Sequence, residues 1–376
     1  MTQMESINLE TELSLFKYDS LEQLPEEYRE LSQQDRTERI ERSLDRLGDS
    51  VVILGHNYQR REIVEHADFV GDSYQLSAEA ANADAEYVLF CGVTFMAESA
   101  DIITDDDQTV ILPSMEASCP MAGMAEALQV DSAWGDIESA APDADIVPIT
   151  YMNSYADLKA FCAEQGGAVC TSSNAHRVFE WALERGDKIL FLPDKHLGEN
   201  TAHRLGLEDG VVEWNPWNPG EDANDVADVD IILWDGYCQV HERFTTEHVE
   251  QVRDDYPDAR VVVHPECRRE VVESADVVGS TATIRETVAD ADPGETWAVG
   301  TEIHLVHHLQ RWHPEASVVP LCGDACMDCN AMQQTDPNYL TWVLEELVAG
   351  RERNVIEVPP EEKELATLAL NRMLEL

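Results

Sequence analysis

Cysteines are the residues of this 376-residue chain best suited to metal or redox chemistry, and there are nine of them. Cys322, Cys326 and Cys329 form the dense spacing C-x3-C-x2-C near the end of the chain. Thiolates at such a spacing suit a soft metal or an iron-sulfur cluster. The other cysteines are scattered, so the sequence must be searched for elements that could bring distant thiols together.

Several kinds of site could use the terminal cysteine cluster. The spacing also occurs in radical-SAM enzymes, although there it usually lies early in the chain with an aromatic residue before the last cysteine, whereas here Asp328 precedes Cys329. A structural zinc site would need a fourth ligand, and the sequence has no second C-x2-C pair to supply it. Cys326 and Cys329 could also form a reversible disulfide, because C-x2-C pairs can carry redox chemistry.

Polar residues follow apolar, strand-like runs three times along the chain. In each of these three repeats, an apolar run leads into a polar triplet, a Ser or Thr follows, and a cysteine comes last. The triplets are His56-Asn57-Tyr58, Tyr151-Met152-Asn153 and His264-Pro265-Glu266; the hydroxyl residues are Ser73, Ser172 and Thr281; and the cysteines are Cys119, Cys238 and Cys329. Because α/β proteins bind ligands at the carboxyl ends of parallel strands, three such units would converge on one site.

The elements that position these residues read as parallel α/β layers. From Val51 onward, short apolar runs alternate with helical stretches. We predict a helical segment at 1–48, α/β domains at 49–125, 126–240 and 241–329, and a C-terminal segment, 330–376, that packs back on the first domain.

Charge and composition exclude several functions. With 75 acidic and 25 basic residues, the formal net charge is -50, which would repel nucleic acids and anionic lipids, and the 44% hydrophobic content argues against a disordered polymer. Such a surface suits a salt-loving organism, because the Debye length falls to about 3 Å at 1 M salt. The sequence lacks a signal-like start and any run of 18 apolar residues. We therefore expect a cytoplasmic protein that binds neither membranes nor nucleic acids, with its thiols reduced.

A set of nine motifs, taken in order, resembles the quinolinate synthase family. The motifs are HNYQ at 56–59, GDS at 71–73, FCGVTFMAE at 90–98, YMN at 151–153, CTSSNA at 170–175, FLPDKHLGEN at 191–200, GYCQVH at 236–241, HPEC at 264–267 and GST at 279–281. The resemblance implies three pseudo-threefold-related, three-layer α/β/α domains with short parallel sheets around a central 4Fe-4S cluster.

The resemblance also implies the ligands of this cluster. By motif they are Cys119, Cys238 and Cys329, which leave one iron open and Cys322 and Cys326 as extra thiols. The family often has Pro after the last ligand, where this chain has Asn330. The remaining cysteines (Cys91, Cys162, Cys170 and Cys267) are expected to be small core residues.

The implied reaction condenses iminoaspartate with dihydroxyacetone phosphate, losing phosphate and two waters, to form quinolinate for NAD biosynthesis. The open iron would act as a Lewis acid. An L-aspartate oxidase or aspartate dehydrogenase would have to supply the iminoaspartate. We expect this functional coupling without identifying a physical partner.

Roles for the other motif residues follow from their chemistry. Hydroxyls of Ser73, Ser172 and Thr281 near helix starts suit carboxylate and phosphate oxygens. Glu266 is the candidate general base, and Tyr58 assists proton transfer. His56 and His264 are candidate donors or proton shuttles, because an unperturbed histidine has a pKa of about 6.5. The implied substrate-binding residues also include Tyr151, Met152, Asn153 and Pro265.

Overall fold

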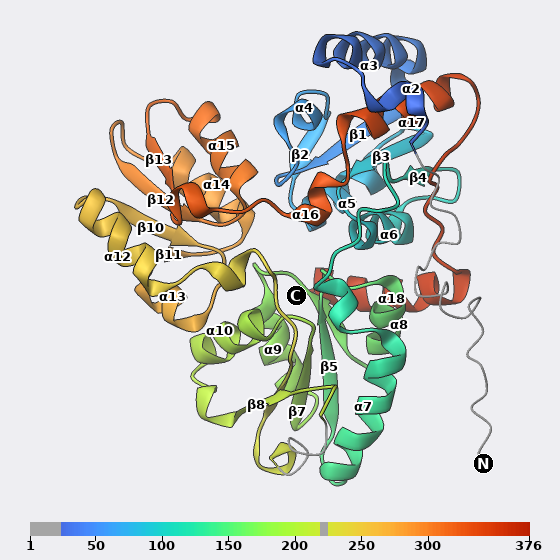
Figure 1. The fold of residues 1–376 in the computed structure, drawn as a ribbon. Coiled ribbons are helices and arrows are strands. Elements are labelled where there is room, and N and C mark those ends of the chain that lie inside the picture. Colours follow the sequence, from blue (N-terminus) through green and yellow to red (C-terminus); the bar gives the residue numbers. More distant parts are fainter. Residues whose placement is uncertain (1–23, 219–224) are drawn as a thin grey trace, which may run out of the picture.

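The protein is described by a computed structural model that covers residues 24–218 and 225–376. Three α/β units surround a common centre, as Figure 1 shows. Each contains one short sheet, and every strand pair within the three sheets is parallel. The predicted α/β fold with three short parallel sheets is therefore confirmed.

The first unit has a four-stranded sheet in the order β2-β1-β3-β4. Its strands are β1 (Val51–His56), β2 (Phe69–Gly71), β3 (Tyr87–Cys91) and β4 (Thr109–Ile111). Its helices are α2 (Glu26–Arg29), α3 (Gln33–Leu47), α4 (Arg61–Val64), α5 (Ser73–Asn82) and α6 (Thr94–Ile103). Successive side chains of β1 point to opposite faces, so that Val52 and Leu54 enter one core while Val51 and Ile53 enter another. This alternation produces the three layers.

The second unit adds one edge strand to the same order, giving β6-β5-β7-β9-β8. The strands are β5 (Ile146–Tyr151), β6 (Ala168–Cys170), β7 (Lys188–Leu192), β8 (Val211–Trp214) and β9 (Ile231–Trp234). The helices are α7 (Ala127–Ala140), α8 (Ala156–Glu164), α9 (Ala175–Leu183) and α10 (Lys195–Leu205). The sheet again separates two cores, since Ile189 and Phe191 of β7 pack on one face and Leu190 and Leu192 on the other.

The third unit repeats the order of the first as β11-β10-β12-β13. The strands are β10 (Arg260–Val263), β11 (Val277–Val278), β12 (Thr296–Gly300) and β13 (Ser317–Pro320). The helices are α12 (Thr246–Asp255), α13 (Arg269–Ser274), α14 (Thr281–Ala289) and α15 (Ile303–Trp312). Val261 and Val263 face one core and Val262 faces the other.

The C-terminal segment divides between two units. The helices α16 (Asn330–Gln333) and α17 (Pro337–Val348) lie with the first unit, where Leu340 and Val343 of α17 enter the core that contains Ile53. By contrast, α18 (Pro360–Leu374) packs on α8 and β6 of the second unit (Figure 1). The prediction that all of 330–376 packs on the first domain is wrong for α18, because its apolar residues, Leu370 among them, enter the core of the second unit.

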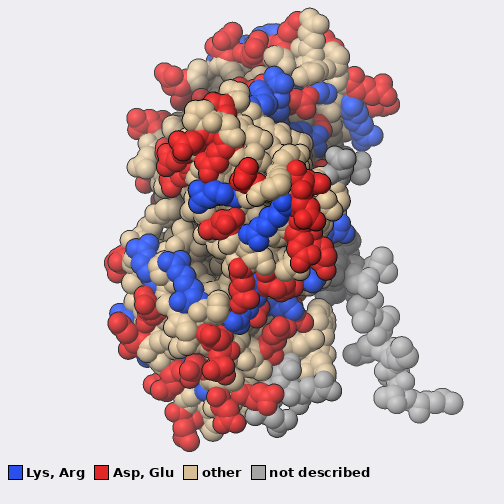
Figure 2. Space-filling view, turned by 90° about the vertical axis from the view of Figure 1, so that its left-hand side faces the viewer, with Lys and Arg blue, Asp and Glu red and all other residues tan. Residues whose placement is uncertain are grey.

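The face of the molecule shown in Figure 2 is rich in acidic side chains. Figure 2 shows Asp and Glu scattered over one face, with Lys and Arg between them. None of the helices in the described part of the chain is long and apolar enough to cross a membrane.

Candidate active site

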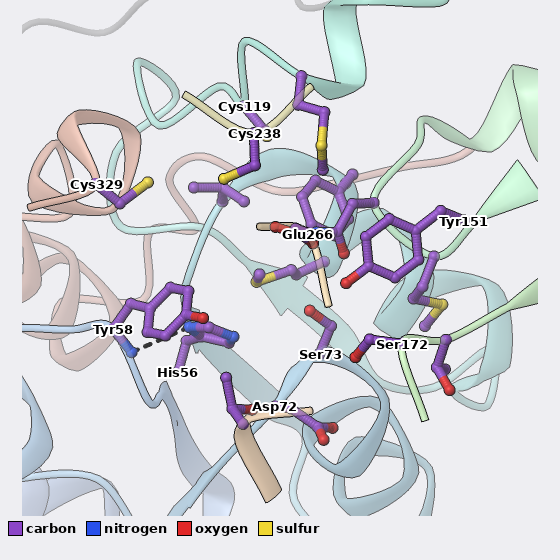
Figure 3. Close-up of a pocket in the computed structure, with 18 of the residues that line it drawn as sticks. His56, Tyr58, Asp72, Ser73, Cys119, Tyr151, Ser172, Cys238, Glu266 and Cys329 are labelled. Atoms are coloured by element: carbon purple, nitrogen blue, oxygen red, sulfur yellow. Dashed lines mark hydrogen bonds between the residues drawn. The ribbon is translucent and has the colours of Figure 1, made fainter. Parts of the chain in front are cut away.

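A cavity lies where the three units meet, and Figure 3 shows its lining. The predicted site residues that line it are His56, Tyr58, Ser73, Cys119, Tyr151, Met152, Asn153, Ser172, Cys238, His264, Glu266, Thr281 and Cys329. Pro265 does not line it. Residues separated by more than half of the chain are thus brought around one space.

The topology explains this convergence. The polar triplets follow or end the equivalent strands β1, β5 and β10, and the hydroxyl residues follow the equivalent edge strands β2, β6 and β11. The cysteines come after β4, β9 and β13, which also hold equivalent places in their sheets. Since the carboxyl ends of parallel strands lie at one edge of each sheet, equivalent residues of the three units face the same centre.

Two of the triplets form the same local turn. The Nδ1 atom of His56 accepts the backbone N–H of Tyr58 at 3.1 Å, and that of His264 accepts the backbone N–H of Glu266 at 3.3 Å. A ring nitrogen that accepts a hydrogen bond carries no proton, so the proton of each neutral ring is on Nε2. Both histidines therefore have one N–H donor available.

Burial changes the expectation for these histidines. It lowers the pKa of His56 to about 3 and that of His264 to about 3, although the carboxylate of Glu266 acts in the opposite direction in both cases. The idea that they change protonation near their unperturbed pKa is thereby revised. Near neutral pH both rings are neutral donors.

The three hydroxyl residues that line the cavity lie at or just before helix starts. Ser73 is the first residue of α5, where Asp72 caps the helix, and Thr281 is the first residue of α14, capped by Ser280. Ser172 lies just before α9. The unpaired N–H groups of a helix N-terminus favour anions, so all three units offer donors to anionic substrate groups.

Glu266 is a buried carboxylate beside two histidines. His241 Nδ1 lies within hydrogen-bonding distance of Glu266 Oε2, at 2.6 Å, whereas His264 Nδ1 lies 3.8 Å from the same oxygen and accepts the backbone N–H of Glu266 instead. Burial alone would raise the pKa of Glu266, but the adjacent His264 and His241 and the hydrogen bonds from His241 and Tyr151 outweigh it and lower the pKa to about 2. Glu266 is therefore ionised near neutral pH and can accept a proton.

A chain of hydrogen bonds connects Glu266 with Tyr58. His241 Nε2 lies 3.0 Å from Thr301 Oγ1, which in turn lies 2.7 Å from the Tyr58 hydroxyl. Thr301 and His241 are buried. The two proposed proton-transfer residues, which belong to different units, are thus held through one histidine and one threonine.

The three cysteines at the cavity have free thiols and come from different parts of the fold. Burial raises the pKa of Cys119 to about 11 and that of Cys329 to about 12, and the charge of Cys119 adds to the rise at Cys329. Burial, the charge of Glu266 and, more weakly, that of Cys329 raise the pKa of Cys238. Bare thiolates here would be buried and would repel one another, and a bound cationic metal centre would relieve both effects. The residues therefore fit an iron-sulfur cluster.

Buried carboxylates hold the backbone of two of these cysteines. Asp194 Oδ2 accepts the N–H of Cys238 at 3.0 Å, and Glu302 Oε1 accepts the N–H of Cys329 at 3.1 Å. Both carboxylates are fully buried. These supports fix where the two thiols enter the cavity.

The terminal cysteine cluster divides differently from the sequence-based expectation. Cys322 and Cys326 are joined by a disulfide with a Cα–Cα distance of 5.1 Å, while Cys329 is free. The alternative of a Cys326–Cys329 disulfide is not found, and the expectation that Cys322 and Cys326 are extra free thiols is wrong. Disulfide sulfurs are not thiolate ligands, so this arrangement disfavours both a radical-SAM site and a zinc site built on the three neighbours.

Sequence reasoning missed several residues around the cavity. Asp72 lines the cavity. His241 and Thr301 do not line it, but His241 contacts the lining residue Glu266 and Thr301 contacts His241. His241 belongs to the GYCQVH motif and Asp72 to the GDS motif. A motif alone does not show which side chains either residue contacts in the folded protein. The scattered cysteines Cys91, Cys162, Cys170 and Cys267 are fully buried core residues, as expected.

The chain is similar to known proteins over almost its whole length. The family described as "Quinolinate synthetase A protein" matches residues 38–375. The chain is 80% identical over 374 residues to the quinolinate synthase of Halobacterium salinarum, covering 99% of this chain and 100% of that one. It is 76% identical over the same share of both chains to the enzyme of Haloarcula marismortui, and 49% identical over 354 residues, 93% of this chain and 95% of that one, to the enzyme of Acidobacterium capsulatum.

Proposed function

Because this chain belongs to the quinolinate synthetase A family, and is thus an enzyme that forms quinolinate for NAD biosynthesis, we propose that the cavity between its three units is the active site. The reaction joins iminoaspartate to dihydroxyacetone phosphate and releases phosphate and two waters. The observation that carries the assignment is that three free thiols, a buried ionised carboxylate and helix-start donors line one cavity.

Members of this family bind a 4Fe-4S cluster, and we propose Cys119, Cys238 and Cys329 as its ligands. Three thiolates would leave one iron open, and that iron would supply Lewis-acid assistance to the loss of water. The remaining steps fall to side chains of the protein.

The donors at the helix starts are proposed to hold the anionic parts of the substrates. Ser73, Thr281 and Ser172 come from three different units, so they can hold separate carboxylate and phosphate groups. His56 and His264 each add an N–H donor, and both rings carry no charge near neutral pH. This local set of donors offsets the acidic surface, which would otherwise repel anionic substrates. Tyr151, Met152 and Asn153 complete the wall that orients the carbon chain.

Glu266 is proposed to be the general base. Ionised and buried, it can remove a proton from a substrate carbon during the isomerisation and dehydration steps. Burial and the charge of Glu266 raise the pKa of Tyr58, so its hydroxyl stays protonated and can donate. Proton movement between Tyr58 and Glu266 would not need bulk water, because Thr301 and His241 lie between them.

Iminoaspartate must come from an enzyme that oxidises aspartate, and we propose functional coupling to an L-aspartate oxidase or an aspartate dehydrogenase. The three free thiols at the cavity suit a reducing compartment such as the cytoplasm, although the Cys322–Cys326 disulfide does not share this preference.

The experiment that tests this proposal separates the two possible cysteine sets. Anaerobically purified Cys119→Ala is expected to lose the full cluster, measured as iron and sulfide content, and to form no quinolinate from dihydroxyacetone phosphate and freshly generated iminoaspartate in high salt. The matched control, Cys322→Ala with Cys326→Ala, is expected to retain the cluster. A full cluster in Cys119→Ala, or its loss in the control, would overturn the assignment.

A further inference from the structure

A buried asparagine of the second unit reaches the turn of the third unit that carries Glu266. Asn200 lies in α10, at the end of the segment 191–200 that matches one of the family motifs. No side chain of this segment lines the central cavity. Asn200 is only 8% exposed, so a role at the molecular surface does not account for it.

Asn200 uses both hydrogens of its amide on the two residues that flank Glu266. Its Nδ2 donates to Pro265 O at 2.8 Å and to Cys267 O at 2.8 Å. Backbone carbonyls can only accept, so the amide group must turn its nitrogen toward them. The backbone on each side of Glu266 is thereby tied to one side chain.

The helix that carries Asn200 is itself firmly seated. At Gly198 a Cβ atom would come within 2.5 Å of Leu233 and 2.6 Å of Phe191, so α10 approaches the sheet more closely than a side chain would allow. Asp194 caps the helix by accepting the N–H of Leu197 at 2.8 Å, while its other carboxylate oxygen holds Cys238. A single rigid helix therefore touches the backbone of Cys238 and the backbone around Glu266.

Glu266 needs such a tie because one of its partners belongs to another unit. The carboxylate hydrogen-bonds with Tyr151 of β5 in the second unit and with His241 of the segment between β9 and β10, whereas its own backbone continues from β10. Any shift between the second and third units would move Glu266 away from Tyr151. The packing of α10 on α13, which Figure 1 shows as neighbours, places Asn200 at that boundary.

We infer that Asn200 is a positioning residue for Glu266, holding the turn 264–267 in register with the second unit so that the carboxylate meets the substrate. This inference rests on the role proposed above for Glu266. Asn200 does not touch the cavity and is not itself a catalytic residue.

A double-mutant cycle on the holoenzyme tests the inference. Asn200→Leu keeps the size of the side chain but removes both donors, and a misplacement of about 1 Å can cost about 100-fold in rate, so kcat is expected to fall about 10- to 100-fold with KM within about threefold. In the Glu266→Gln background, the same substitution is expected to add no further loss of kcat. Iron and sulfide content is measured in parallel and is expected to stay at the wild-type level.

Thr201→Val is the matched control. Thr201 is the next residue in α10, is equally buried, and bonds only to Leu197 O of its own helix. It is expected to leave kcat unchanged in both backgrounds. If Asn200→Leu does not fold, Asn200→Asp preserves the shape and removes donor capacity, and it should show the same dependence on Glu266.

The outcomes separate the inference from the function on which it rests. An equal loss from Asn200→Leu in both backgrounds, or no loss in either, would overturn the positioning role alone. Wild-type turnover in Glu266→Gln would refute the proposed role of Glu266, and the inference would fall with it.

Discussion

A conservative substitution at Thr301 would test the proposed connection between Tyr58 and His241. The hydroxyl of Thr301 lies 2.7 Å from the Tyr58 hydroxyl and 3.0 Å from His241 Nε2, and the threonine is fully buried. Thr301→Val keeps the shape and removes the hydroxyl, so that the buried His241 and the half-buried Tyr58 each lose a partner.

The magnitude follows from these contacts. Leaving one buried polar group unpaired costs about 1–3 kcal/mol, so we expect Thr301→Val to lower the free energy of unfolding by about 1–3 kcal/mol, chiefly through His241. Tyr58 and His241 would also lose their fixed positions, and a displacement of about 1 Å near the reacting atoms can reduce turnover about 100-fold. Because Thr301 does not line the cavity, kcat should fall about 10- to 100-fold while KM changes little.

The assay is steady-state quinolinate formation by the anaerobic holoenzyme, with denaturant unfolding measured alongside. Thr301→Ser is the control, because it retains the hydroxyl and loses one methyl group, worth about 1 kcal/mol. It should therefore keep most of the turnover. Wild-type kcat in Thr301→Val, or equal losses in the Val and Ser variants, would refute the idea that this hydroxyl connects Tyr58 with His241.

Two further predictions concern stability. Burial lowers the pKa of His264 to about 3. Between about pH 6.5 and pH 3 the unfolded chain therefore binds a proton at this residue that the folded chain does not bind, so the free energy of unfolding falls as the pH drops through this range. In unfolding titrations across this range His264→Asn should give a shallower decline than the wild type, and an identical slope would contradict the assignment. Leu370 of α18 is 3% exposed in the core of the second unit, so Leu370→Ala should cost about 2–4 kcal/mol of unfolding free energy. Leu368→Ala in the same helix, at a position 46% exposed, should change the unfolding midpoint little, and equal effects would show that α18 is not docked as described.

Much of the fold could be predicted because the information is local and repeated. Each apolar run that becomes β1, β5 or β10 is buried on both faces, and each is followed by polar residues where the strand ends. The position of α18 could not be predicted in this way, because its sequence indicates an amphipathic helix without indicating which sheet its apolar face covers.

The sequence by itself determined the threefold repeat and the candidate chemistry, because strand periodicity and residue type are properties of short segments. The sequence also indicated which thiols, hydroxyls, histidines and which carboxylate, that of Glu266, line the cavity. Contacts between segments far apart in the chain were decided only by the tertiary structure. Examples are the bridge of His241 and Thr301 between Glu266 and Tyr58, and the reach of Asn200 across two units. The same holds for the neutral state of His264, since burial and neighbouring charges shift a pKa, and neither exists before the chain folds.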